Sequence, residues 1–151
     1  NLKGYSLNSD LCKAIKEGCL KFPELFDSLI LENNGLKDDS MSMLISGLEN
    51  LTKLKKFACN NNEMNHQSLY FIQKILAKAP PNYIEELRLT NCRLARALTD
   101  ELIEGIMDDC QLKKLGLVKC NLHFYSIPNL CYLIENSNYL TDLDISWNDL
   151  N

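Results

Sequence analysis

The sequence lacks several features that would mark a membrane, exported or nucleic-acid-binding protein. None of its apolar runs approaches the roughly 18–20 residues that span a bilayer, so no membrane insertion is predicted. No basic-then-apolar signal segment opens the sequence. Its net charge of −4 leaves no basic excess to attract a phosphate backbone, so nucleic acid is not an expected partner.

Signatures of catalysis and metal binding are also missing. Only 2 histidines occur, His66 and His123, and nothing in the sequence brings a nucleophile close to either. There is no Ser/His/Asp signature, no glycine-rich phosphate loop and no zinc-ligand spacing. We therefore expect a protein that is not an enzyme and that holds no metal or cofactor.

The cysteines are not arranged as a disulfide framework. Their number, 7, is odd, and no two form a Cys-x-x-Cys pair. A secreted disulfide scaffold favours an even, closely spaced set, whereas free thiols suit the reducing cytosol. We therefore expect a cytoplasmic protein. Its 151 residues, 46% of them apolar and 24% charged, have the size and composition of one globular domain.

What the sequence does contain is an internal repeat. The template apolar-x-x-apolar-x-apolar-x-x-(Asn/Cys)-x-apolar recurs along the chain, and each copy reads as a short strand running into a turn. A looser first copy has Tyr5 at the fourth template position, 24 residues before Leu29. From Leu29 onward this position recurs at steps of 28, 30, 28 and 28 residues, at Phe57, Leu87, Leu115 and Leu143. The expected strand units are 2–12, 26–36, 54–64, 84–94, 112–122 and 140–150.

A helical pattern follows the template copies. Apolar residues recur eight and twelve positions after the last template residue, and two residues four apart share one face of a helix. Each unit is therefore predicted to contain a strand, a turn and an amphipathic helix. A further helix is expected over residues 10–22, with Leu11, Ala14, Ile15 and Cys19 on one side. The paired helix positions are Leu44/Leu48, Ile72/Leu76, Leu102/Ile106 and Leu130/Ile134.

This pattern resembles the leucine-rich repeat family. The 28-residue period, the Asn/Cys alternation and the full helix are similar to the ribonuclease-inhibitor-like subclass. The resemblance implies an α/β fold, a right-handed solenoid shaped as a horseshoe arc, with parallel strands on the concave side and helices on the convex side. We expect residues 1–151 to form a single leucine-rich repeat domain within a longer protein, with further repeats or a cap after Asn151.

The ninth template position is predicted to be structural. It holds Asn34, Asn62 and Asn148, and it is replaced by Cys92 and Cys120 in two units. A buried carboxamide can donate and accept hydrogen bonds, so it can satisfy turn groups that would otherwise cost about 1–3 kcal/mol each. A thiol packs as a small hydrophobe with a weak donor. We therefore interpret both cysteines as structural.

Charged residues alternate in sign along the second and third template positions. Neighbours in the third column include Lys56, Glu86 and Lys114, which would lie side by side in a parallel sheet. The favoured interpretation is a solvated ladder that supports strand register. The alternative is the charged edge of a partner site.

Candidate contact residues lie on or near the open face of the predicted strands. Exposed tryptophan and arginine are typical anchors of protein interfaces. Trp147, the only tryptophan, has a second interpretation, in which it covers the end of the core or meets a following unit. The predicted partner-binding residues are Arg88, Asn91, Val118, Lys119 and Trp147.

Three functions are compatible with this architecture. The leading one is a non-catalytic protein–protein interaction module or scaffold of a larger protein, because curved repeat surfaces offer broad and rigid contact area. The second is a structural subunit of a large cytoskeletal or ciliary assembly. The third is the repeat region of an inhibitor or an innate-immune-type receptor, ranked last because the lysine-rich rows do not form the acidic rim that binding a basic enzyme would require.

Overall fold

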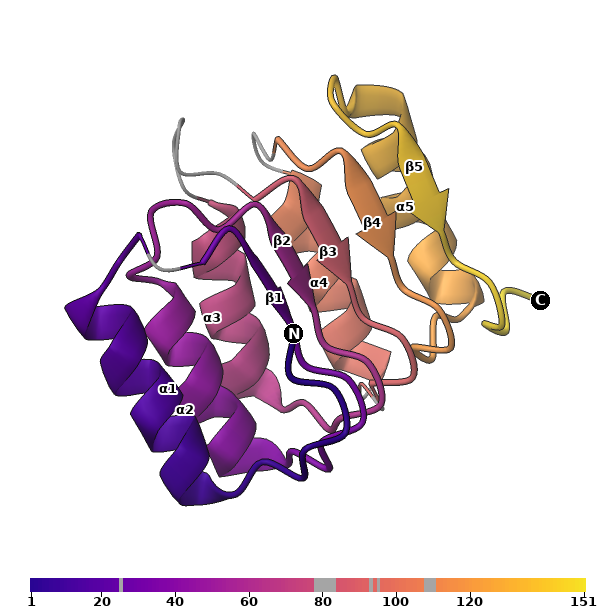
Figure 1. Cartoon of the computed structure of the whole chain (residues 1–151). Helices are drawn as coiled ribbons and strands as arrows, with labels where there is room; N and C mark the ends of the chain where they lie inside the picture. Colours follow the sequence, from indigo (N-terminus) through magenta and orange to yellow (C-terminus); the bar gives the residue numbers. More distant parts are fainter. Residues whose placement is uncertain (25, 78–83, 93, 95, 108–110) are drawn as a thin grey trace.

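The computed structural model describes residues 1–24, 26–77, 84–92, 94, 96–107 and 111–151. Short strands and helices alternate along the chain and stack side by side (Figure 1). The strands are β1 (Ser28–Ile30), β2 (Lys56–Ala58), β3 (Glu86–Arg88), β4 (Lys114–Gly116) and β5 (Asp142–Asp144). The helices are α1 (Ser9–Lys21), α2 (Asp38–Leu48), α3 (His66–Leu76), α4 (Arg96–Met107), η1 (Phe124–Ser126, a 3-10 helix) and α5 (Ile127–Asn136).

One parallel sheet runs through the stack in the order β1-β2-β3-β4-β5. Its register places Leu29 beside Phe57, then Leu87, Leu115 and Leu143 in succession. These residues share the fourth template position, so the predicted repeat register is confirmed from β1 onward. The helices cover one face of the sheet (Figure 1). The chain is therefore an α/β solenoid with parallel strands on its concave side and helices on its convex side.

The core lies between the sheet and the helices. In β1, Leu29 is buried while its neighbours on both sides are partly exposed, because side chains alternate faces along a strand. One unit cannot bury its apolar face alone, so stacked units share one core. Buried residues from successive strands and helices include Leu31, Cys59, Leu89, Leu117, Leu44, Leu48, Ile72, Leu76, Leu102 and Ile106.

Side chains at the ninth template position tie each unit to the one before it. The Asn62 Nδ2 donates to the Leu31 carbonyl at 2.6 Å, and the Asn62 Oδ1 accepts the Leu36 N–H at 3.0 Å. Cysteine acts in the same way, because the Cys120 Sγ donates to the Leu89 carbonyl at 2.6 Å. Burial raises the pKa of the Cys120 thiol to about 12, which keeps it in the neutral donor form. The structural interpretation of this position therefore agrees with the geometry.

The first unit has a different register from the one expected. Residues 2–12 contain no strand. The Leu2 N–H nevertheless donates to the Ile30 carbonyl at 2.8 Å, and the Leu31 N–H makes the equivalent backbone bond to the unit that follows it. Leu2 therefore occupies in the first unit the repeat position that Leu31 occupies in the second unit, 29 residues later in the sequence. The expected placement of Tyr5 at a core position is wrong, because Tyr5 is 67% exposed.

Helix α1 lies where a helix was expected, but it buries a different face. It begins after Asn8, whose side chain accepts the Leu11 N–H at 2.9 Å and so caps the first turn. Its buried residues are Cys12 and Cys19, whereas Leu11, expected on the buried side, is 44% exposed. The helix pattern is right at Cys19 and Ile15 and wrong at Leu11 and Ala14, both of which are exposed.

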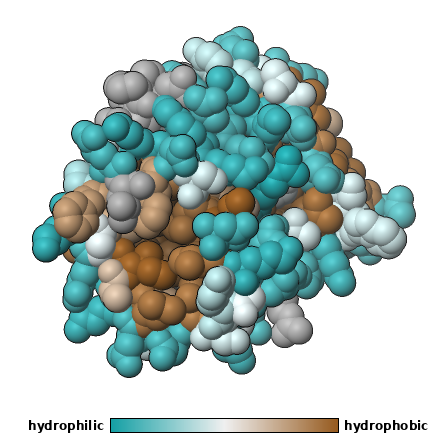
Figure 2. Space-filling model, in the orientation of Figure 1, coloured by the Kyte–Doolittle hydropathy of each residue, from teal (hydrophilic) through white to brown (hydrophobic). Residues whose placement is uncertain are grey.

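The two ends of the stack carry apolar surface. At the N-terminal end, hydrophobic side chains gather between α1 and β1 (Figure 2). At the other end, Ile134 of α5 is 57% exposed, although its counterpart Ile106 is 2% exposed. Ile134 was expected to be a core residue, and this placement is wrong because no described residue covers the outer flank of α5.

Candidate binding surface at the strand ends

Each unit turns out of the sheet through a residue with left-handed backbone conformation, at the eighth template position. This conformation brings Cβ close to the following carbonyl oxygen, so glycine and asparagine adopt it more readily than other residues. The first four units follow this preference, but the last two carry lysine and tryptophan. The residues and their φ angles are Gly4 (+72°), Asn33 (+54°), Asn61 (+54°), Asn91 (+52°), Lys119 (+54°) and Trp147 (+60°).

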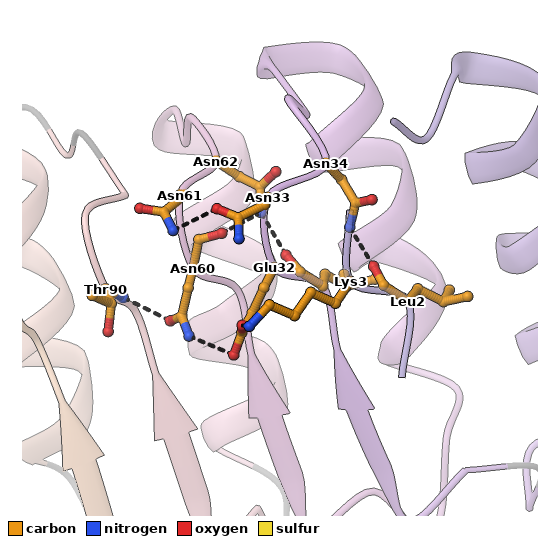
Figure 3. A network of polar contacts seen from close by, with 10 residues as sticks. Leu2, Lys3, Glu32, Asn33, Asn34, Asn60, Asn61, Asn62 and Thr90 are labelled. Carbon is orange, nitrogen blue, oxygen red and sulfur yellow. Dashed lines mark hydrogen bonds and ion pairs between the residues drawn. The ribbon is translucent and has the colours of Figure 1, made fainter. Parts of the chain in front are cut away.

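The asparagines of this column form an exposed ladder of side-chain amides. The Asn61 Nδ2 donates to the Asn33 Oδ1 at 2.6 Å, and the Asn91 Nδ2 donates to the Asn61 Oδ1 at 2.8 Å. Beside this ladder, the Asn60 Nδ2 donates to the Glu32 Oε1 at 3.0 Å (Figure 3). The strand ends of neighbouring units are thus joined by side chains as well as by the backbone.

The ladder leads into an open depression of about 470 Å³, called here the strand-end depression. Four of the five predicted contact residues line it. Trp147 is 86% exposed there, so its indole is available to a partner. Lys119 is exposed and Val118 is partly buried. The residues lining the strand-end depression are Asn61, Thr90, Asn91, Val118, Lys119 and Trp147.

Sequence reasoning did not select two of these six residues. Asn61 and Thr90 occupy the eighth and seventh template columns, the same columns as Asn91 and Val118. Their positions in these columns, beside the residues that were selected, could have predicted them from the sequence. Thr90 is also held by a neighbouring unit, since its N–H donates to the Asn60 Oδ1 at 2.9 Å.

Arg88, the fifth predicted contact residue, does not line the strand-end depression. It lies on β3, where its Nε donates to the Glu86 Oε1 at 2.6 Å, and the Lys56 Nζ lies 2.8 Å from the same oxygen. Partial burial acts to raise the pKa of Glu86, but the two cations outweigh it and lower that pKa. Arg88 therefore belongs to a cluster of charges on the strand face.

The predicted charge alternation produces pairs between adjacent strands. Besides the cluster at Glu86, the Lys113 Nζ lies 2.8 Å from the Glu85 Oε2. Exposed pairs of this kind contribute about 0–1 kcal/mol each. Their effect is mainly to avoid like charges across the sheet, in agreement with the ladder interpretation.

The two histidines contact neighbouring side chains, and His123 is half-buried. The His66 Nδ1 lies 3.4 Å from the Glu101 Oε2, with both side chains well exposed. The His123 ring stacks on Tyr125, with 5.7 Å between ring centroids. Within the described ranges, no group of three or more His, Cys, Asp or Glu side chains is placed to hold a metal ion. No helix of that part of the chain is long and apolar enough to cross a membrane.

Comparison with known proteins gives relatives of the same kind. No family model matches the sequence. The chain is 29% identical to pig (Sus scrofa) ribonuclease inhibitor over 151 residues, which is 99% of this chain and 32% of that protein. It is 27% identical to mouse (Mus musculus) ribonuclease inhibitor over 130 residues, covering 83% of this chain and 27% of the relative. A third relative is mouse NACHT, LRR and PYD domains-containing protein 5, 28% identical over 136 residues, or 88% of this chain and 12% of that protein.

The chain spans about a third or less of the length of each of these relatives. The similarity nevertheless runs through nearly all of the units described above. With its strands in register, a helix between successive strands and an Asn/Cys turn position, the chain has the α/β solenoid fold of leucine-rich repeat proteins, and its sequence is similar to ribonuclease inhibitors.

Proposed function

We propose that this chain is a non-catalytic protein-binding module of a larger protein, and that its partner contacts the strand-end depression. The observation that carries the proposal is the exposure of Trp147, at 86%, in a depression it shares with Lys119. A solvent-exposed tryptophan on a rigid repeat surface is the kind of residue that dominates protein interfaces. The negative net charge of −4 favours a protein partner over nucleic acid.

The relatives support binding as the mode of action. A ribonuclease inhibitor is, by its name, a protein that acts on another protein. The similarity to a NACHT, LRR and PYD domains-containing protein favours the inhibitor or innate-immune-receptor alternative over the cytoskeletal or ciliary one. We keep this as the second candidate function.

The free thiols support a cytoplasmic location. The cysteines of the described residues are unpaired, and Cys12, Cys19, Cys59, Cys92 and Cys120 are buried. Free thiols persist in a reducing compartment. We propose this location together with the binding function.

We further propose that another unit of the same kind covers the outer flank of α5 and β5. The support is the exposure of Ile134 and the partial exposure of Leu143 and Ile145, whose counterparts in the inner units are buried. A repeat stack needs a following unit or a polar cap at such a flank.

Binding with matched surface variants tests the main proposal. Immobilised wild-type chain and the double variant Lys119→Asn/Trp147→Asn are exposed to a cell extract, and the bound proteins are identified by mass spectrometry. The control is Lys74→Glu on α3, an exposed residue of the helix side. Thermal melting followed by circular dichroism verifies that all three proteins fold.

We expect a partner that the wild type and Lys74→Glu retain and the double variant loses. Because both altered residues line the strand-end depression, this result locates the contact there. Retention by the double variant with loss in Lys74→Glu would place the interface on the helices and refute the proposal.

A further inference from the structure

Two residues of the strand-end depression occupy a backbone conformation that their side chains do not favour. Lys119 and Trp147 have φ angles of +54° and +60°. Asparagine tolerates this region better than most residues because its short polar side chain can bond to the nearby backbone. Lysine and tryptophan have no such compensation. Strained residues that persist in a fold point to a function at that position.

Packing does not explain Trp147. At 86% exposure its indole buries little surface, so in the described chain it does not cover the end of the core. The side chain instead forms a wall of the strand-end depression together with Val118. This exposure does not agree with the idea from the sequence that Trp147 covers the end of the core, whereas contact of Trp147 with a following unit stays a prediction.

The chemistry of the depression defines what fits it. Among its six described lining residues, Lys119 is the only charged one. In a chain of net charge −4, an exposed cation without an acidic neighbour in the same lining is complementary to a carboxylate. Trp147 and Val118 provide an apolar surface beside this cation.

The amide ladder adds groups that match a peptide backbone. Each asparagine Nδ2 carries two hydrogens, and the ladder uses one hydrogen of Asn61 and one of Asn91. Carboxamides both donate and accept, as peptide groups do. The ladder thus suits a segment of extended chain laid along the depression.

We infer that the strand-end depression binds an acidic peptide segment of a partner protein, in which an aspartate or glutamate lies beside a proline or an aliphatic residue. The carboxylate pairs with the Lys119 ammonium, and the apolar side chain lies on the Trp147 indole. The segment backbone bonds to the asparagine ladder. This inference rests on the proposed function and specifies its partner.

The test is a selection of peptides from a random 12-residue display library on the immobilised 151-residue chain. Selected peptides are synthesised with a fluorescent label, and their affinities are measured by fluorescence polarisation. The variants are Lys119→Asn and Trp147→Asn, because asparagine fits the left-handed backbone at both positions. Lys74→Asn on the helix side is the control for loss of a positive charge.

We expect the enriched peptides to contain an acidic residue within two positions of a proline or aliphatic residue. Lys119→Asn and Trp147→Asn should each weaken binding by about 10-fold or more, the loss typical of an interface anchor, while Lys74→Asn leaves it unchanged. Replacing the peptide's acidic residue with its amide should weaken binding to the wild type but not to Lys119→Asn. Both asparagine variants should melt at the same temperature as the wild type or higher.

Two other outcomes overturn the inference in different ways. Enriched peptides without an acidic residue that still lose affinity in Trp147→Asn would show that the depression binds, but with a different chemistry. The proposed function would then stand. Recovery of no peptide, or of peptides that bind both variants as well as the wild type, would refute the depression as a site for such segments, and the extract experiment would then decide whether the strand face binds at all.

Discussion

At the scale of single residues, the ninth template position shows how one task can be performed by two side chains. The carbonyl at the sixth position of the preceding unit needs a donor, and it receives one from Asn62 Nδ2, Cys120 Sγ or Asn148 Nδ2. Asn62 also accepts a hydrogen bond from the Leu36 N–H, and a carboxamide oxygen is a stronger acceptor than a thiol sulfur. The asparagine units are therefore expected to depend more strongly on this side chain than the cysteine units.

The first prediction concerns Asn62. The Asn62→Ala change removes both bonds and leaves a buried carbonyl and a buried N–H without partners, so we expect a loss of about 2–4 kcal/mol in the free energy of unfolding. The control is Asn61→Gly in the exposed ladder, which keeps the left-handed backbone and should cost less than about 1 kcal/mol. Urea unfolding measures both, and equal losses would contradict the assignment.

The second prediction concerns thiol reactivity. Burial raises the pKa of Cys120 to about 12, and contact with Cys59 together with burial raises the pKa of Cys92 well above its ordinary value. A raised pKa keeps these thiols protonated at pH 8, and the thiolate is the reactive form. Iodoacetamide should therefore modify the exposed Cys131 in the native protein and the other two only after unfolding. Peptide mapping by mass spectrometry would detect early modification of Cys92 or Cys120, which would be inconsistent with these environments.

At the scale of elements, one apolar pattern has different energetic value in different helices. Leu76 of α3 and Ile134 of α5 hold the same position in their units, but Leu76 is 2% exposed and Ile134 is 57% exposed. The difference arises because α3 lies between α2 and α4, whereas α5 has α4 on one side and, apart from the adjoining η1, contacts no other helix among the described residues. How much an apolar side chain contributes to folding stability therefore depends more on the elements packed against its helix than on the sequence of that helix.

The third prediction follows from this comparison. Leu76→Ala should cost about 2–5 kcal/mol, because it opens a cavity in the shared core. Ile134→Ala should cost less than about 1 kcal/mol, since most of that side chain is already in water. Guanidinium unfolding of the 151-residue chain, at a concentration where it is monomeric, tests the pair. A large loss at Ile134 would mean that α5 is covered within the monomer.

At the scale of the whole molecule, apolar side chains lie at both ends of the stack that the described residues form. The N-terminal end has partly buried Leu2, Ile15 and Phe26 at its margin, and the C-terminal end has Leu143 and Ile145. Two such different apolar flanks can meet head to tail, and a head-to-tail contact leaves a free end on each copy. Association of this kind would bury the surfaces that stacking leaves exposed.

The fourth prediction is that the 151-residue chain self-associates through these flanks. Sedimentation velocity should show a sedimentation coefficient that rises with protein concentration. Ile134→Asp should reduce this rise, because it places a charge on the C-terminal flank, where the side chain is largely exposed. The matched control, Tyr70→Asp, places the same charge on the exposed surface of α3 and should leave the rise unchanged. A sedimentation coefficient independent of concentration in the wild type would contradict the prediction.

The sequence by itself determined the repeat. Strand alternation and a period near 28 residues depend on local geometry, so the columns through Leu29 and Leu31, the Asn/Cys turn position and the alternating charges could all be predicted. Four of the five contact residues share one depression for the same reason, since residues in one column lie side by side when units stack. Arg88 lies apart from them because it belongs to β3 itself, where it pairs with Glu86, and the other four follow the strands.

The register, exposure and clustering of side chains that depend on contacts between units were determined only by the tertiary structure. The register at Leu2, the exposure of Leu11 and Ile134, and the inclusion of Asn61 and Thr90 in the depression follow from which unit lies alongside. The left-handed backbone at the eighth position has the same origin, because the turn there is fixed by bonds to adjacent units. A repeat sequence encodes the face that each side chain takes, whereas burial and clustering depend on contacts between units that no single unit contains.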